Sequence, residues 1–270
     1  MPSAEERLAL VQSKIERAKK HVACLDTEIS AFFASDPYEI GTKRDPQTRK
    51  LIYYVSRANT VPIAIPAITG DVIQNLRTAL DYLHQKLLMV GTNSAVPSKG
   101  QDATFFIDGD PNQPKHYETS MPAKVQGLRQ DAIDGLLAIE PYKGGKGHDL
   151  WVLNTLNNID KHRLLVTVGS AFQSANLGAH VSGMMRKAFG EHIPIMDAFF
   201  RPADTMCPLK AGDELFTDAP DAEPQQHLNF RFNISLNEPE IGEPKPLLET
   251  VQQLIDLVGN TTVRFGPCLA

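Results

Sequence analysis

Apolar side chains recur every three to four residues over residues 4–34, and this stretch contains neither Gly nor Pro. That period is typical of an amphipathic α-helix, which is expected to end at Asp36-Pro37. The apolar stripe consists of Leu8, Val11, Ile15, Ala18, Val22, Leu25, Ile29 and Phe32. It fits packing inside the protein and pairing with a second subunit equally well, so a homodimer through the N-terminal helix is one expectation.

The same period returns from Asp71 to about Met89 and predicts a second helix, with Gly91 beyond its end. Its stripe contains Val72, Leu76, Leu80, Leu83 and Leu87. Before it, residues 51–55 favour a short strand. Residues 61–66 hold two prolines and fit only an edge strand or an extended entry to the helix.

Residues 91–123 are rich in Gly, Pro, Asn and Asp, apart from an apolar island at 105–107. We expect a long surface loop that one short strand at this island anchors. Two further helices are predicted at 124–139 and 148–163, separated by the glycine-rich segment 143–147. The first half of the chain is therefore mainly helical.

After Leu164 the apolar period changes to two, as in antiparallel strands with one face in water. Strands are predicted at 164–168, 181–189 and, with the clearest alternation, 228–236, followed by an amphipathic helix at 247–258. No regular alternation of strands and helices appears, so the sequence predicts an α+β fold. We expect one domain over residues 1–270, in which helices of residues 1–165 pack on an antiparallel sheet formed mainly by residues 166–270, with a C-terminal helix.

Composition places the chain among ordinary globular proteins, with 42% hydrophobic and 22% charged residues over 270 positions. Lys and Arg total 27 against 32 acidic residues, and the basic residues are scattered, so duplex DNA is not an expected partner. Three cysteines without a CxxC pair indicate reduced thiols. No long apolar run is present, so we expect no membrane contact and a cytoplasmic location.

The most concentrated polar chemistry begins on the second helix, where Arg77, Asp81 and His84 are spaced i, i+4 and i+7. Residues with this spacing share a narrow strip of a helix. The strip borders the apolar stripe, so the three side chains are expected to face a neighbouring element and not open water.

The helix at 148–163 places Asp160 and Arg163 in the same sector as its apolar residues. Buried charge is costly unless it is paired. The simplest arrangement packs the two helices together, pairing Arg77 with Asp160 and Arg163 with Asp81.

Two functions fit this cluster. In the first, Arg77 and Arg163 bind an anionic ligand or RNA, Asp81 and Asp160 orient them, and His84 transfers a proton. Such a site would allow RNA cleavage without a metal. In the second, the charges form an interhelical ion network in a noncatalytic interaction protein. Neither function requires a cofactor, and no metal-ligand motif occurs in the sequence.

Two blocks of sequence resemble paired motifs of a family of uncharacterised bacterial proteins. The first, residues 75–83, reads NLRTALDYL, and the second, residues 150–165, contains LNNIDKHR. The resemblance extends from the second helix to the strand after Arg163, and it implies a bacterial origin without a particular activity. The spacing of Arg77 and His84 also resembles the motif of HEPN-type ribonucleases, which implies catalytic roles for these two residues.

Overall fold

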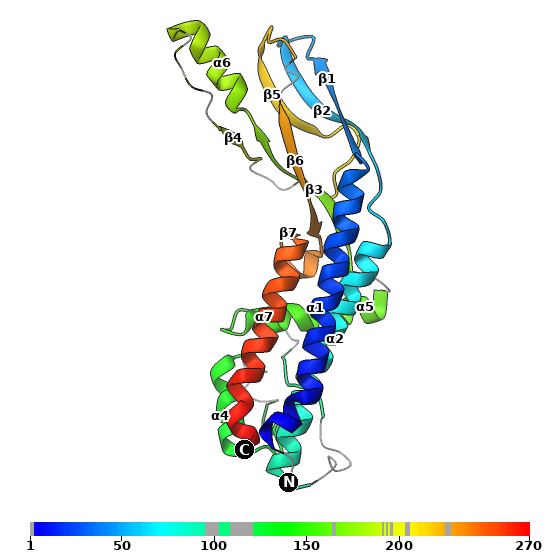
Figure 1. Cartoon of the computed structure of the whole chain (residues 1–270), viewed down its shortest axis with the longest axis vertical. Helices are drawn as coiled ribbons and strands as arrows, with labels where there is room; N and C mark the ends of the chain where they lie inside the picture. The colour runs from blue at the N-terminus through cyan, green and yellow to red at the C-terminus, as the bar shows by residue number, and fades with distance from the viewer. Residues whose placement is uncertain are drawn as a thin grey trace. The chain divides into compact units, whose positions relative to one another are not determined.

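The computed structural model describes residues 3–94, 103–108, 121–163, 166–190, 192, 194, 197–202, 206–224 and 228–270. Contacts divide the chain into two compact units (Figure 1). We call Met1–Thr27, Ala64–Val166 and Leu248–Ala270 the helical unit, and Glu28–Ile63 with Thr167–Leu247 the sheet unit. Both classes of secondary structure are present, which confirms the α+β prediction, while the single domain over 1–270 stays a prediction.

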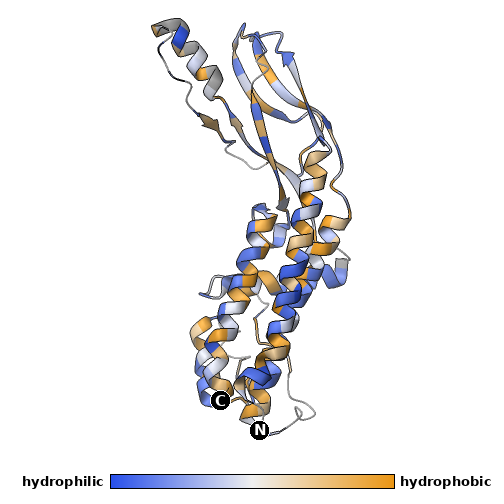
Figure 2. Cartoon of the chain, in the orientation of Figure 1, coloured by the Kyte–Doolittle hydropathy of each residue, from blue (hydrophilic) through white to orange (hydrophobic). Residues whose placement is uncertain are grey.

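The helical unit is built on α1 (Ala4–Ala34), up to Thr27, and on α2 (Ala64–Gly91), which run side by side in Figure 1. The predicted bounds of α1 are confirmed, and its apolar stripe is buried at Val11, Ala18 and Leu25. Figure 2 shows apolar and polar residues alternating along this helix. Because the stripe packs within the chain itself, a homodimer through α1, which stays a prediction, would have to use other residues.

The helical unit also contains α4 (Gln130–Ile139), α5 (His148–Arg163) and α7 (Leu247–Phe265), and residues 121–124 are helical as well. The first residue of α7, Leu247, is assigned to the sheet unit. A short 3-10 turn, η2 (Gly266–Leu269), ends the chain. The bounds of α5 confirm the prediction. α4 begins later than the predicted Lys124, because residues 125–127 form a turn in which Gly127 adopts a φ of 94°.

The start of α2 at Ala64 corrects the predicted start at Asp71 and the extended segment before it. Pro66 lies in the first turn of this helix, where backbone N–H groups have no intrahelical acceptor. A proline there removes no hydrogen bond. The two prolines therefore mark a helix start, and not an edge strand.

The sheet unit contains two antiparallel sheets. One has the order β1-β2-β5, formed by Tyr38–Arg44, Lys50–Ala58 and Glu214–Pro220. The other has the order β4-β3-β6-β7, formed by Phe199–Phe200, Val168–Asn176, Asn229–Leu236 and Lys245–Pro246. A 3-10 turn, η1 (Pro239–Ile241), joins β6 to β7.

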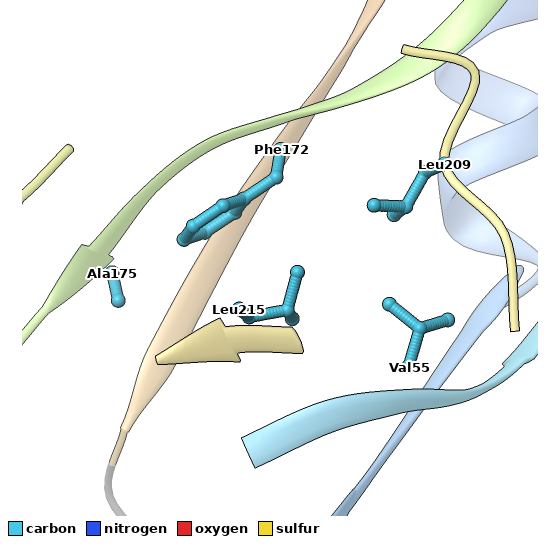
Figure 3. Packing of buried hydrophobic residues seen from close by; sticks show 5 residues of the cluster. All are labelled: Val55, Phe172, Ala175, Leu209 and Leu215. Atoms are coloured by element: carbon cyan, nitrogen blue, oxygen red, sulfur yellow. The ribbon is translucent and has the colours of Figure 1, made fainter. Parts of the chain in front are cut away.

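Side chains from both sheets meet in a shared apolar core (Figure 3). Val55 and Leu215 come from the first sheet, and Phe172 and Ala175 from the second. The rings of Phe230 and Phe232 on β6 lie 6.1 and 6.0 Å from that of Phe172. The predicted alternation at 228–236 is thus confirmed as a strand whose aromatic side chains face the core.

The predicted strand at 181–189 is wrong, because these residues belong to helix α6 (Gly178–Phe189). Its apolar positions Val181, Met184, Met185, Ala188 and Phe189 have helical spacing, i, i+3, i+4, i+7 and i+8. The side-chain Oδ1 of Asn176 accepts a hydrogen bond from the N–H of Gly178 at 2.9 Å, at the start of the helix. A period-two reading of this stretch overlooked the stronger helical repeat.

Other boundaries also differ from prediction. Residues 105–107 are described but form no strand, and the strand predicted from Leu164 begins at Val168, with Leu164 and Leu165 outside the described residues. α7 continues past Gly259 to Phe265. Among the described helices, none is long and apolar enough to cross a membrane.

Two helical glycines give opposite stability predictions. A Cβ at Gly259 would meet nothing within 4 Å, so Gly259→Ala is expected to stabilise the protein by about 0.5–1 kcal/mol through helix propensity. A Cβ at Gly91 would lie 2.1 Å from the carbonyl oxygen of Gly127, so Gly91→Ala is expected to cost about 1–3 kcal/mol. Urea unfolding of both variants checks the pair, and a destabilised Gly259→Ala would contradict it.

Candidate functional site

The centre of the predicted site is an ion pair within α2. Arg77 Nη1 lies 2.6 Å from Asp81 Oδ1, one helical turn away, and the two side chains are 10% and 25% exposed. Salt bridges at this spacing on an exposed helix contribute little, but this one is largely withdrawn from water. Its value therefore depends on what else the two groups bind.

Both groups bind the backbone of Phe105, in the apolar island of the loop. Arg77 Nη2 donates to the carbonyl oxygen of Phe105 at 2.9 Å, and the N–H of Phe105 donates to Asp81 Oδ1 at 3.0 Å. Phe105 is buried, and buried backbone groups need partners. The ion pair satisfies both backbone groups of this residue, as a neighbouring strand would.

The same guanidinium also joins α2 to α5. Arg77 Nε donates to Asn154 Oδ1 at 3.1 Å. The partner that α5 supplies to Arg77 is therefore the neutral Asn154, where the sequence suggested Asp160. Arg77 consequently links three segments: its own helix, the loop at Phe105 and α5.

His84 completes the cluster on its apolar side. Its side chain is 0% exposed, and its ring meets that of Phe105 edge-on at 6.4 Å. Phe105 in turn makes an edge contact of 6.1 Å with Phe265 of α7. His84 thus belongs to the packing that fixes Phe105 between α2 and α7.

Asp160 of α5 contacts a different part of α2, at Gly70. A Cβ added at Gly70 would lie 2.4 Å from Asp160 Oδ1, so the carboxylate occupies the space that a larger side chain would fill. Seven residues separate Gly70 from Arg77, about 10 Å along a helix. Asp160 makes no salt bridge with any residue that the structure describes. Burial, and then the nearby charge of Asp71, raise the pKa of Asp160 above its ordinary value.

Arg163 is the last residue of α5, and its side chain lies outside the described part of the structure, as does its expected pairing with Asp81. Of the five candidate residues, the structure thus brings Arg77, Asp81 and His84 together around Phe105. It places Asp160 about two helical turns from them.

Sequence reasoning did not identify Phe105 and Asn154 as members of the cluster. The apolar island at 105–107 in a polar loop was the available signal for Phe105. Asn154 and Asn157 are three residues apart on α5, and Asp160 and Lys161 continue the same polar row. This polar row, on a helix with buried neighbouring residues, was the signal for Asn154. Neither signal identifies the residue of α2 with which Phe105 or Asn154 interacts.

Within the described ranges, no group of three or more His, Cys, Asp or Glu side chains is arranged to hold a metal ion. The three cysteines are free thiols, and burial raises the pKa of the Cys207 thiol to about 11.

No protein-family model, curated protein or solved structure matches the chain. The resemblance to a bacterial family therefore stays a prediction.

Replacing Arg77 is expected to destabilise the protein strongly. Arg77→Ala strands the Asp81 carboxylate and the Phe105 carbonyl in a largely buried position, at a cost of about 3 kcal/mol in the free energy of unfolding. Arg77→Lys keeps the charge but loses the planar fork that reaches three acceptors, so it is expected to lose stability as well, by less.

Chemical denaturation measures both changes, and Lys19→Ala is the matched control, because it removes an exposed ion pair with Glu16 from α1. That control is expected to change stability by at most about 1 kcal/mol. Equal losses for Arg77→Ala and Lys19→Ala would show that the buried pair does not hold the helical unit together.

Asp160→Asn is expected to stabilise the protein at neutral pH. Because the pKa of Asp160 is raised in the folded state, its ionisation opposes folding, and stability falls as pH rises from the ordinary carboxyl value to the folded value. Below that window both states are protonated, so the substitution should have little effect. The test measures the melting temperatures of the wild type and Asp160→Asn from pH 3 to pH 8, with about one measurement per pH unit. A variant less stable than the wild type at neutral pH would contradict it.

Proposed function

We propose that the chain is a noncatalytic binding protein in which Arg77, Asp81 and His84 form the internal framework of the helical unit. The observation that supports this proposal is the double contact of the Arg77–Asp81 pair with the backbone of Phe105. These groups are occupied in holding a buried loop segment, and an arrangement of that kind serves packing better than it serves a substrate.

Burial further favours this function over RNA cleavage. A proton-transfer residue must come within hydrogen-bond distance of the substrate, directly or through one water. His84 and Arg77 are both buried, so a substrate would reach them only after Phe105 left its position between α2 and α7. The same movement would break the three contacts of Arg77 with Asp81, Asn154 and Phe105.

The separation of Asp160 from the cluster supports the same proposal. A catalytic arrangement of the kind expected from sequence needs Asp160 to orient Arg77, yet Asn154 occupies that place. The negative charge of Asp160 lies near Asp71, whose charge raises its pKa further. Arg77 and Asp160, which the sequence suggested as a pair, therefore lie in different surroundings.

The direct test incubates the wild-type protein with total RNA and transfer RNA in EDTA and follows the RNA by gel electrophoresis. We expect no cleavage. His84→Ala and His84→Gln serve as controls, with circular dichroism to show which of them is folded. Metal-independent cleavage by the wild type that is lost in a folded His84 variant would overturn the proposed function.

A further inference from the structure

A polar groove of about 410 Å³ lies between α1 and α2, outside the Arg77 cluster. Both helices belong to the helical unit and run side by side there (Figure 1). The groove is lined by Ser13, Lys14, Arg17, His21, Asp71 and Asn75. Its volume falls in the range of small-molecule sites, but its lining is more polar than most.

The α1 side of the groove carries two cations, Lys14 and Arg17, which are three residues apart on one helical face. Neither makes a salt bridge with a residue in the described part of the chain. Lys14 Nζ lies 6.0 Å from the centre of the Tyr82 ring, and Arg17 Nε donates to His21 Nε2 at 3.2 Å. The terminal amino groups of Arg17 make no hydrogen bond to the described residues, so its planar fork can still receive an anion.

His21 connects this cationic side to the opposite wall. Because its Nε2 accepts from Arg17, the proton of a neutral His21 ring is on Nδ1. That Nδ1 lies 3.9 Å from Asp71 Oδ2 on α2. Arg17 is thereby held towards the groove by a neighbour whose other nitrogen faces a carboxylate.

The α2 side presents acceptors. Asp71 is exposed, and Asn75 uses its side-chain Nδ2 to donate to the backbone carbonyl of Asp71 at 2.7 Å. Asn75 can still offer a ligand its Oδ1 as an acceptor, together with the second N–H of Nδ2 as a donor. One wall of the groove therefore supplies positive donors, and the other supplies oxygens that accept hydrogen bonds.

We propose that this groove binds a small phosphate ester that carries neighbouring hydroxyl groups, such as a sugar phosphate. Arg17 and Lys14 bind the phosphate, and Asp71 and Asn75 accept hydrogen bonds from the hydroxyls, a common role of carboxylates towards ribose. Inorganic phosphate fits less well, because it lacks the hydroxyl half and meets the negative charge of Asp71. This inference rests on the proposed function, since it names the ligand of a binding protein.

Isothermal titration calorimetry of the whole chain with ribose 5-phosphate, inorganic phosphate and ribose tests the groove. We expect wild-type protein to bind ribose 5-phosphate at least about tenfold more tightly than either of the other two. Arg17→Gln is expected to lower the affinity for ribose 5-phosphate by at least about tenfold, because it removes the fork that holds the phosphate. Lys20→Gln removes the same charge from the exposed part of α1 outside the groove and is expected to bind as the wild type does.

Asp71→Asn gives the sharper result, because the two probes should respond in opposite directions. Binding of ribose 5-phosphate is expected to weaken, since a hydroxyl acceptor loses its charge, while binding of inorganic phosphate is expected to strengthen, since a repelling charge is removed. A wild-type protein that binds no ribose 5-phosphate, equal losses in Arg17→Gln and Lys20→Gln, or weaker binding of both probes by Asp71→Asn would each overturn the groove assignment. These outcomes leave the Arg77 framework untouched, because cleavage of RNA and the stability of Arg77 variants test that separately.

Discussion

The helical unit depends on one interaction, the hold of the Arg77–Asp81 pair on the backbone of Phe105. The apolar island at 105–107 can bury its rings only if its backbone groups also find partners, since an unpaired buried N–H or C=O costs as much as a lost hydrogen bond. No strand is available to Phe105 in the described structure. A donor and an acceptor one turn apart on α2 take its place, and the ring of Phe105 can then pack against His84 and Phe265.

The charges around this contact follow from the same requirement. Arg77 and Asp81 neutralise each other, so a further negative partner for Arg77 would leave one uncompensated charge in a largely buried place. Asn154 provides an acceptor without adding charge. Asp160, in contrast, makes no salt bridge with a described cation. Burial, and then the charge of Asp71, raise its pKa. The amide of Asn154 therefore completes a hydrogen-bonded network, whereas the carboxylate of Asp160 is a partly buried acid without a salt bridge to the described residues.

Sequence alone predicted those parts of the fold that depend on periodicity within one element. The bounds of α1 and the strand ending at Leu236 could be predicted, because each carries a regular apolar repeat, and the bounds of α5 were also predicted. α6 was missed, since a period-two pattern was assigned to residues 181–189 although their apolar positions have the stronger helical spacing. For the site, helical phase placed Arg77, Asp81 and His84 on one strip. Phase gives the direction in which a side chain points but not the height at which two helices cross, so it could not choose between Asn154 and Asp160 as the partner of Arg77. The hydrogen bonds of Phe105 use backbone groups, which have no sequence signature at all.

A polar cluster can bind a ligand only when some of its hydrogen-bond donors and acceptors are unused within the protein and accessible to solvent. Around Arg77, the described hydrogen bonds are made within the protein. They hold the buried Phe105 segment against α2 and link α2 to α5. Between α1 and α2 the situation is reversed, because Lys14 and Arg17 make no salt bridge with the described residues and Arg17 is exposed. Arg17 is nevertheless positioned through His21, whose ring reaches towards Asp71 on the facing helix. The Arg77 cluster thus joins α2 to α5 and to Phe105, whereas the groove between α1 and α2 presents donors and acceptors that can still bind a ligand.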